Sequence, residues 1–218
     1  MKNIIIVIAA LFLAGCLTNP INLKTAQNYY HGGNKNAKED KWFNARMAYG
    51  RAWTNADSGN ADDRVTAVYA YEYGRASGAI CDWDESEKGL LKALELDKKT
   101  NGPFHMSLVE LARMYNSKGN LKDSEKYFSL AKARLDELQA DTRDSIGYAN
   151  ILKTYSDVLL KLDRKSEADA LIKREQEIRN VFKGRKSSHD LTPYGEHCNQ
   201  KSLTSTSTPT GAKDAPAG

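Results

Sequence analysis

The sequence lacks the alternating pattern of apolar and polar residues that predicts β-strands. No stretch combines sustained period-two alternation with a valine, isoleucine and threonine cluster between turn residues. An excess of one charge is also lacking, because 32 basic and 28 acidic residues are interspersed and leave a net charge of only +4. The first absence favours an all-α fold, and the second gives no indication of a nucleic-acid partner.

Motifs for catalysis and metal binding are missing as well. There is no Cys-x-x-Cys, His-Glu-x-x-His or Gly-x-Ser-x-Gly motif and no glycine-rich phosphate loop. The four histidines are scattered, and the acidic cluster around Asp82 and Glu85 is typical of a helix start. We therefore expect no enzyme, no metal site and no cofactor.

Only the N-terminus carries a long apolar run. Lys2 precedes an apolar stretch from Ile4 to Ala14, which is shorter than the roughly 20 residues that span a bilayer. This pattern predicts a signal peptide, residues 1–15, that is removed from the mature chain. No later stretch approaches membrane length.

The end of this run, Leu13-Ala14-Gly15-Cys16, resembles the bacterial lipobox. The resemblance implies that Cys16 becomes the acylated N-terminus and holds the protein on a membrane through its lipid. In Gram-negative sorting, a leucine at position 17 in place of aspartate resembles outer-membrane cargo, which would lie on the periplasmic face. The alternative is an ordinary cleaved signal, which would export a protein without an anchor.

Three cysteines are present, and lipid on Cys16 would leave Cys81 and Cys198 as a pair. In an exported, oxidising setting such a pair predicts a disulfide. Two free thiols are the alternative.

Between residues 36 and 182, apolar residues return every three or four positions, with glycine, asparagine and aspartate at the breaks. This periodicity predicts a series of helices, preceded by a weak one near 22–31. The expected ranges are 38–55, 62–79, 83–96, 104–118, 121–138, 144–161 and 164–182.

Small and apolar residues recur at matching positions in alternate helices. In one helix type the sets begin at Ala45, Ser86, Ser124 and Ala168, with spacings of 41, 38 and 44 residues. The full sets are Ala45, Tyr49 and Ala52; Ser86, Leu90 and Ala93; Ser124, Phe128 and Ala131; and Ala168, Ile172 and Glu175. In the other type, Leu111-Ala112 with Tyr115 corresponds to Tyr73-Gly74 and to Tyr155-Ser156. A small residue lets two helices approach, so these patterns predict stacked helix pairs.

This arrangement resembles the tetratricopeptide repeat (TPR), and its spacings exceed the usual 34 or so residues, as in kinesin-light-chain-like repeats. The resemblance implies a right-handed solenoid of three to four helix pairs over residues 37–183, with residues 16–36 as a tether and weak first helix. A generic helical bundle is the alternative.

After Gly184 the helical period stops. Residues 184–218 are expected to be mostly disordered, above all from Lys201 onward, where serine, threonine, proline and alanine dominate. The stretch 190–198 contains Leu191 and Tyr194, which favours docking on the solenoid near Cys198 over a flexible spacer.

The resemblance also implies a concave groove lined by the first helix of each pair. The residues assigned to this groove are Tyr71, Arg75, Val109, Arg113, Asn116 and Lys153. Arg75 and Arg113 occupy equivalent positions, so they should stand side by side and could bind the carboxylates of a peptide. Alternatively, Glu72 and Glu110 neutralise them within the protein.

The resulting hypothesis is a membrane-anchored scaffold that binds a protein or peptide in the cell envelope, within an assembly, pilus or secretion complex. A structural or chaperone-like repeat module without a groove ligand is the alternative. An enzyme acting in the envelope is a third hypothesis.

Overall fold

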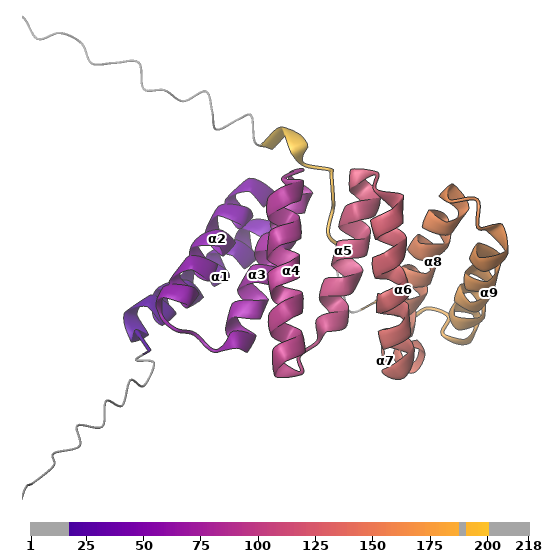
Figure 1. The fold of residues 1–218 in the computed structure, drawn as a ribbon, viewed down its shortest axis with the longest axis horizontal. Coiled ribbons are helices and arrows are strands. Elements are labelled where there is room, and N and C mark those ends of the chain that lie inside the picture. Colours follow the sequence, from indigo (N-terminus) through magenta and orange to yellow (C-terminus); the bar gives the residue numbers. More distant parts are fainter. Residues whose placement is uncertain (1–17, 188–190, 201–218) are drawn as a thin grey trace, which may run out of the picture.

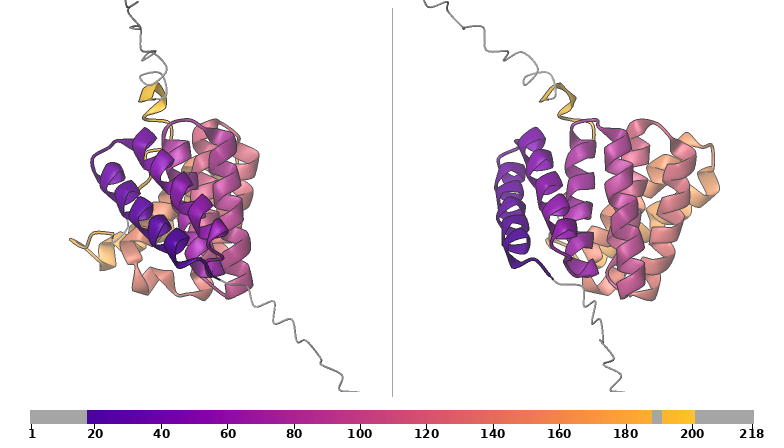
Figure 2. Two further views of the ribbon diagram at one scale, coloured as in Figure 1. Left: turned by 90° about the vertical axis from the view of Figure 1, so that its left-hand side faces the viewer. Right: turned by 60° about the vertical axis from the view of Figure 1, so that its left-hand side comes forward.

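The computed structural model describes residues 18–187 and 191–200, and in these ranges the chain is a row of helices without any strand (Figure 1). The predicted all-α class is therefore confirmed. The helices are α1 (Pro20–Lys38), α2 (Trp42–Ser58), α3 (Asp63–Ala79), α4 (Trp83–Thr100), α5 (Phe104–Lys118), α6 (Leu121–Glu137), α7 (Ala140–Arg143), α8 (Ser145–Lys161) and α9 (Lys165–Val181). Figure 2 shows the same row from two further sides.

The first helix is longer than predicted. In place of a tether with a weak helix at 22–31, α1 runs for 19 residues, with the Asn19 side chain accepting hydrogen bonds from the N–H groups of Ile21 and Asn22. Gly33 lowers the helix propensity of this segment, but the Tyr49 ring of α2 occupies the space that a Cβ there would need. Tertiary packing thus outweighs propensity, and α1 and α2 form a complete first pair.

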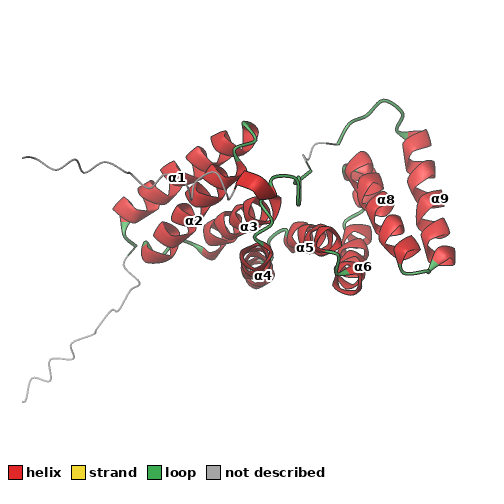
Figure 3. Cartoon of the chain, turned by 90° about the horizontal axis from the view of Figure 1, so that it is seen from above, coloured by secondary structure: helices red, strands yellow, loops and turns green. Residues whose placement is uncertain are grey.

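The other pairs are α3–α4, α5–α6 and α8–α9, and each packs against the next in sequence order. The one-turn helix α7 is inserted before the last pair, which accounts for the longest repeat spacing. Seen end-on in Figure 3, the first helices α3, α5 and α8 lie on one side of the row, while α4 and α6 lie on the other.

The repeated positions form the core. Ala45, Leu90 and Phe128 have no exposed surface, and the other members of the first three sets are buried too. In the last set only Ile172 is half-buried, because α9 ends the row and has a neighbour on one side only. A Cβ on Gly74 would lie 2.8 Å from the Leu90 side chain, so this close approach of α3 and α4 depends on glycine.

The predicted signal peptide, Cys16 and the tail from Lys201 lie outside the described residues. In the part of the chain that is described, no helix is both long and apolar enough to cross a membrane.

Candidate functional site

The side of the row formed by α3, α5 and α8 carries a cluster of charged residues, in which Glu110 is buried and Glu72, Arg75 and Arg113 are half-buried. Equivalent positions on α3 and α5 bring Arg75 and Arg113 to the same carboxylate, Glu110. Arg113 Nη1 donates to Glu110 Oε1 at 3.2 Å, and Arg75 Nε lies 3.8 Å from Glu110 Oε2. Arg75 Nη1 also donates to Glu72 Oε2 at 2.9 Å. The cluster therefore holds two positive and two negative charges and is neutral in sum.

The chain itself covers this cluster. After α9 it turns back along the side of α3, α5 and α8, so that residues 191–200 reach α3 (Figure 3). The Thr192 hydroxyl lies between two charged groups, accepting from Arg75 Nε at 2.7 Å and donating to Glu110 Oε2 at 2.7 Å. The Tyr194 hydroxyl donates to the same Glu110 oxygen at 2.8 Å, and Arg113 Nη2 donates to the Thr192 carbonyl at 3.2 Å.

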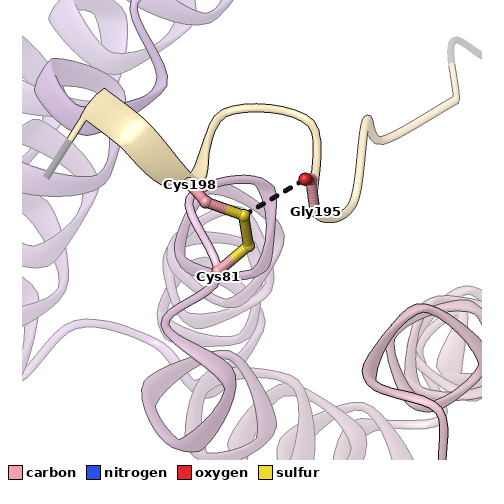
Figure 4. The surroundings of a disulfide bond; sticks show 3 residues. All are labelled: Cys81, Gly195 and Cys198. Atoms are coloured by element: carbon pink, nitrogen blue, oxygen red, sulfur yellow. Dashed lines mark hydrogen bonds between the residues drawn. A yellow bond between two sulfur atoms is a disulfide. The ribbon is translucent and has the colours of Figure 1, made fainter.

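Covalent and backbone bonds hold the same segment on α3. Cys81, just after α3, forms a disulfide with Cys198, with the two Cα atoms 5.0 Å apart (Figure 4). The N–H groups of Gly195 and His197 donate to the carbonyls of Gly78 and Ala79 at 3.2 and 3.0 Å. The Tyr194 ring packs where a Cβ on Gly78 would lie, so the glycine leaves room for the segment.

Charge and burial set the protonation of the cluster. Burial acts to raise the pKa of Glu110, but Arg113, Arg75 and the hydroxyls of Thr192 and Tyr194 outweigh it and hold this pKa below its ordinary value. Burial raises the pKa of Glu72, with Arg75 acting against it. Burial and the Glu110 charge raise the pKa of Tyr194 well above its ordinary value. Glu110 is thus an ionised acceptor surrounded by donors.

This geometry corrects the predicted role of the two arginines. They do stand side by side, as their register predicts, but Glu72, Glu110 and Thr192 already engage their guanidinium groups. The alternative of internal neutralisation therefore describes them better than binding to an acidic ligand.

Of the remaining predicted groove residues, Asn116 and Lys153 contact residues other than the arginines. Lys153 is exposed and donates to Asp157 Oδ1 at 2.6 Å, and Asn116 accepts from Lys161 at 3.2 Å. Tyr71 lies under Arg75, with the guanidinium carbon 5.5 Å from its ring centre. Val109, like Tyr71, packs against core residues and also lines the cavity described next.

A cavity of about 1000 Å³ remains open beside the docked segment. Its walls come from α1, α2, α3, α5, the end of α6, α7, α8 and the segment itself. The apolar part of the lining includes Trp42, Tyr71, Met106, Val109, Leu138, Ile151, Leu191 and Pro193. The lining also includes charged residues, among them Glu110 and Arg113, and a mainly apolar concave surface with some polar groups is typical of a binding site.

The sequence pattern offered Glu110 as a partner of the arginines but did not indicate Thr192, or that the Thr192 and Tyr194 hydroxyls donate to Glu110. The expected docking of Leu191 and Tyr194 pointed to the right segment, but Leu191 is 63% exposed and the buried residue beside it is Thr192. No group of residues that would hold a metal ion is found in the described ranges.

The chain matches no protein-family model and no curated protein. Among solved structures, BtubC (BKLC) from P. vanneervenii aligns with a TM-score of 0.68 over 76% of this chain and 69% of that chain, at 15% identity. A kinesin light chain-like protein from Podosopora anserina, with nearly identical TPR-like repeats, aligns with a TM-score of 0.58 over 73% and 77%, at 16% identity. At such identities the likeness shows the fold, which is a solenoid of TPR-like repeats.

Proposed function

We propose that this chain is a lipid-anchored scaffold of a bacterial cell envelope, and that its solenoid binds a segment of a partner protein in the concave cavity. The observation that carries the proposal is the cavity of about 1000 Å³, which remains open beside the docked segment. Half-buried apolar side chains such as Met106, Val109 and Ile151 line it without filling it. Covering them with apolar side chains of a partner would remove this surface from water, which is favourable.

Export and anchoring rest on separate support. The Cys81–Cys198 disulfide supports export, since disulfides persist in oxidising compartments. Only three residues separate Cys16 from Pro20, where α1 begins, so lipid on Cys16 would hold this end of the solenoid at the membrane. Ile21, in the first turn of α1, is 75% exposed and would face the same region. In a Gram-negative cell we place the protein on the periplasmic face of the outer membrane.

Capture of the partner from detergent-solubilised envelope tests the cavity. Wild type should retain one partner in stoichiometric amount, and Met106→Glu should lose it because a charge would enter the apolar lining. Leu130→Glu is the matched control, because Leu130 is 48% exposed and is not part of the cavity lining. Capture of the same partner by Met106→Glu and wild type would place recognition elsewhere.

Palmitate labelling tests the anchor. Wild type should incorporate labelled palmitate and sediment with membranes, whereas Cys16→Ser should do neither while keeping its helical content, since the substitution leaves every residue of the described helices unchanged. Equal labelling of both proteins would refute lipid attachment at Cys16.

A further inference from the structure

The segment 191–200 contacts the solenoid in the way a bound peptide contacts its receptor. Alternate side chains face opposite ways: Thr192 and Tyr194 are 2% and 8% exposed, whereas Leu191 is 63% exposed and Pro193 is half-buried. The buried pair supplies two hydroxyl donors to one carboxylate, and the backbone adds one accepted and two donated hydrogen bonds. The side-chain contacts thus require hydroxyl groups at two particular positions, whereas the backbone hydrogen bonds could form with many sequences.

The cluster beneath this segment favours a neutral donor over an acidic ligand. Arg75 and Arg113 are balanced by Glu72 and Glu110, so no net positive charge is left to attract a carboxylate. Without the segment, Glu110 would lose two hydroxyl donors, and a buried acceptor left without its donors is unfavourable. The chemistry that replaces them is a pair of hydroxyl side chains two residues apart in a turned segment, in which the Tyr194 N–H donates to the Thr192 carbonyl at 2.9 Å.

One covalent bond decides whether the segment can leave. Its other contacts are non-covalent, and Cys198, which forms the disulfide with Cys81, is an exposed residue. The thiolate of a dithiol reductant can attack one sulfur of the bond, which displaces the other cysteine and forms a mixed disulfide. The second thiol of the reductant then displaces the remaining cysteine from this mixed disulfide. The products are two cysteine thiols and the oxidised reductant, so electrons and protons balance.

We propose that residues 191–200 are a built-in ligand of the solenoid, latched by Cys81–Cys198, and that the site beneath accepts a short peptide with a hydroxyl-x-hydroxyl pattern once the latch is opened. This proposal deepens the proposed function, because it names the chemistry of a partner that would bind the same concave face. Its biological role rests on the proposed function, whereas binding of the peptide does not. The site is defined by Glu110, Arg75 and Arg113 on the solenoid.

A peptide supplied in trans tests the recognition. The probe is a fluorescent Leu-Thr-Pro-Tyr-Gly-Glu-His peptide, which copies residues 191–197 without a cysteine. Oxidised wild type should not bind it, because the tethered segment competes at an effective concentration on the order of millimolar. The full-length variant Thr192→Ala/Tyr194→Ala/Cys198→Ser should bind it, since its own segment lacks both donors and the latch.

A second peptide checks the pattern. Replacing its threonine by valine and its tyrosine by phenylalanine keeps the shape and removes both donors, so affinity for the vacated site should fall by about 10-fold or more per hydroxyl. Circular dichroism confirms that the variant is folded. The proposed recognition would be overturned if the folded variant did not bind the first peptide, or if it bound both peptides with equal affinity.

Hydrogen exchange tests the latch in the full chain. The Gly195 and His197 amides, which donate to α3, should be protected in oxidised wild type. Dithiothreitol or Cys198→Ser should accelerate their exchange by about 100-fold, the order of gain that a second tether supplies, while amides within α8 stay unchanged as a control. Unchanged protection after reduction would make the segment a permanent part of the fold and overturn the latch. Neither experiment uses the envelope partner, so either can fail while partner capture succeeds.

Discussion

Glu110→Gln is the substitution that most directly tests the charge cluster. Glu110 is 6% exposed and accepts from Thr192, Tyr194 and Arg113, with Arg75 Nε 3.8 Å away. Glutamine keeps the shape but removes the negative charge, so two half-buried guanidinium groups lose a counterion that is itself buried. Breaking a buried ion pair by removing one partner costs about 3–5 kcal/mol.

Glu72→Gln is the matched control. Glu72 also pairs with an arginine three residues later on its helix, but its side chain is 19% exposed and burial already raises its pKa, which disfavours the ionised form. We expect its loss to change stability by less than about 1 kcal/mol.

Thermal unfolding followed by circular dichroism separates the two variants. For a chain of this size about 1 kcal/mol shifts Tm by roughly 2–4 °C, so Glu110→Gln should lower Tm by about 6–20 °C and Glu72→Gln by less than about 4 °C. Equal shifts in the two variants, with the disulfide intact, would refute the argument that Glu110 is the central acceptor.

Three further predictions concern acid stability, the disulfide and the repeat packing. Because the pKa of Glu110 is lowered on folding, its ionised form stabilises the fold fully above the unfolded pKa of about 4.3, and this contribution is lost as the pH falls through the lower folded pKa. Tm should therefore fall more steeply in acid for wild type than for Glu110→Gln, and parallel curves would contradict this. Mass spectrometry of a non-reduced digest should find the Cys81–Cys198 peptide, and its bond should contribute about 2–4 kcal/mol; two free thiols in freshly isolated protein would contradict the pairing. Ala112→Leu should destabilise by about 1–3 kcal/mol in urea titration, because Ala112 is fully buried and its carbonyl accepts from Ser124 across the helix pair. Ala133→Leu on the exposed face of α6 is its control, and an equal effect at both sites would refute the packing argument.

Local pattern alone determined most of the architecture. A helix needs only residues three and four positions apart to share a face, so the spacing of apolar residues placed seven of the helices within a few residues of their ends. The repeated small residues also identified the pairs, since Gly74 and Ala112 must lie where two helices meet. The equivalence of Arg75 and Arg113 followed from the same register.

Tertiary structure decided what those residues do. Tyr49 packing over Gly33 completes α1, which propensity alone left weak. Glu110 receives its donors from Thr192 and Tyr194, more than 80 residues later in the chain, and the disulfide joins residues 117 apart. Contacts between such distant residues depend on where the folded solenoid brings its C-terminal segment, and no periodicity in the sequence encodes that path. The helices and their pairing are therefore properties of the sequence pattern, whereas the occupied cluster and the cavity beside it are properties of the folded chain.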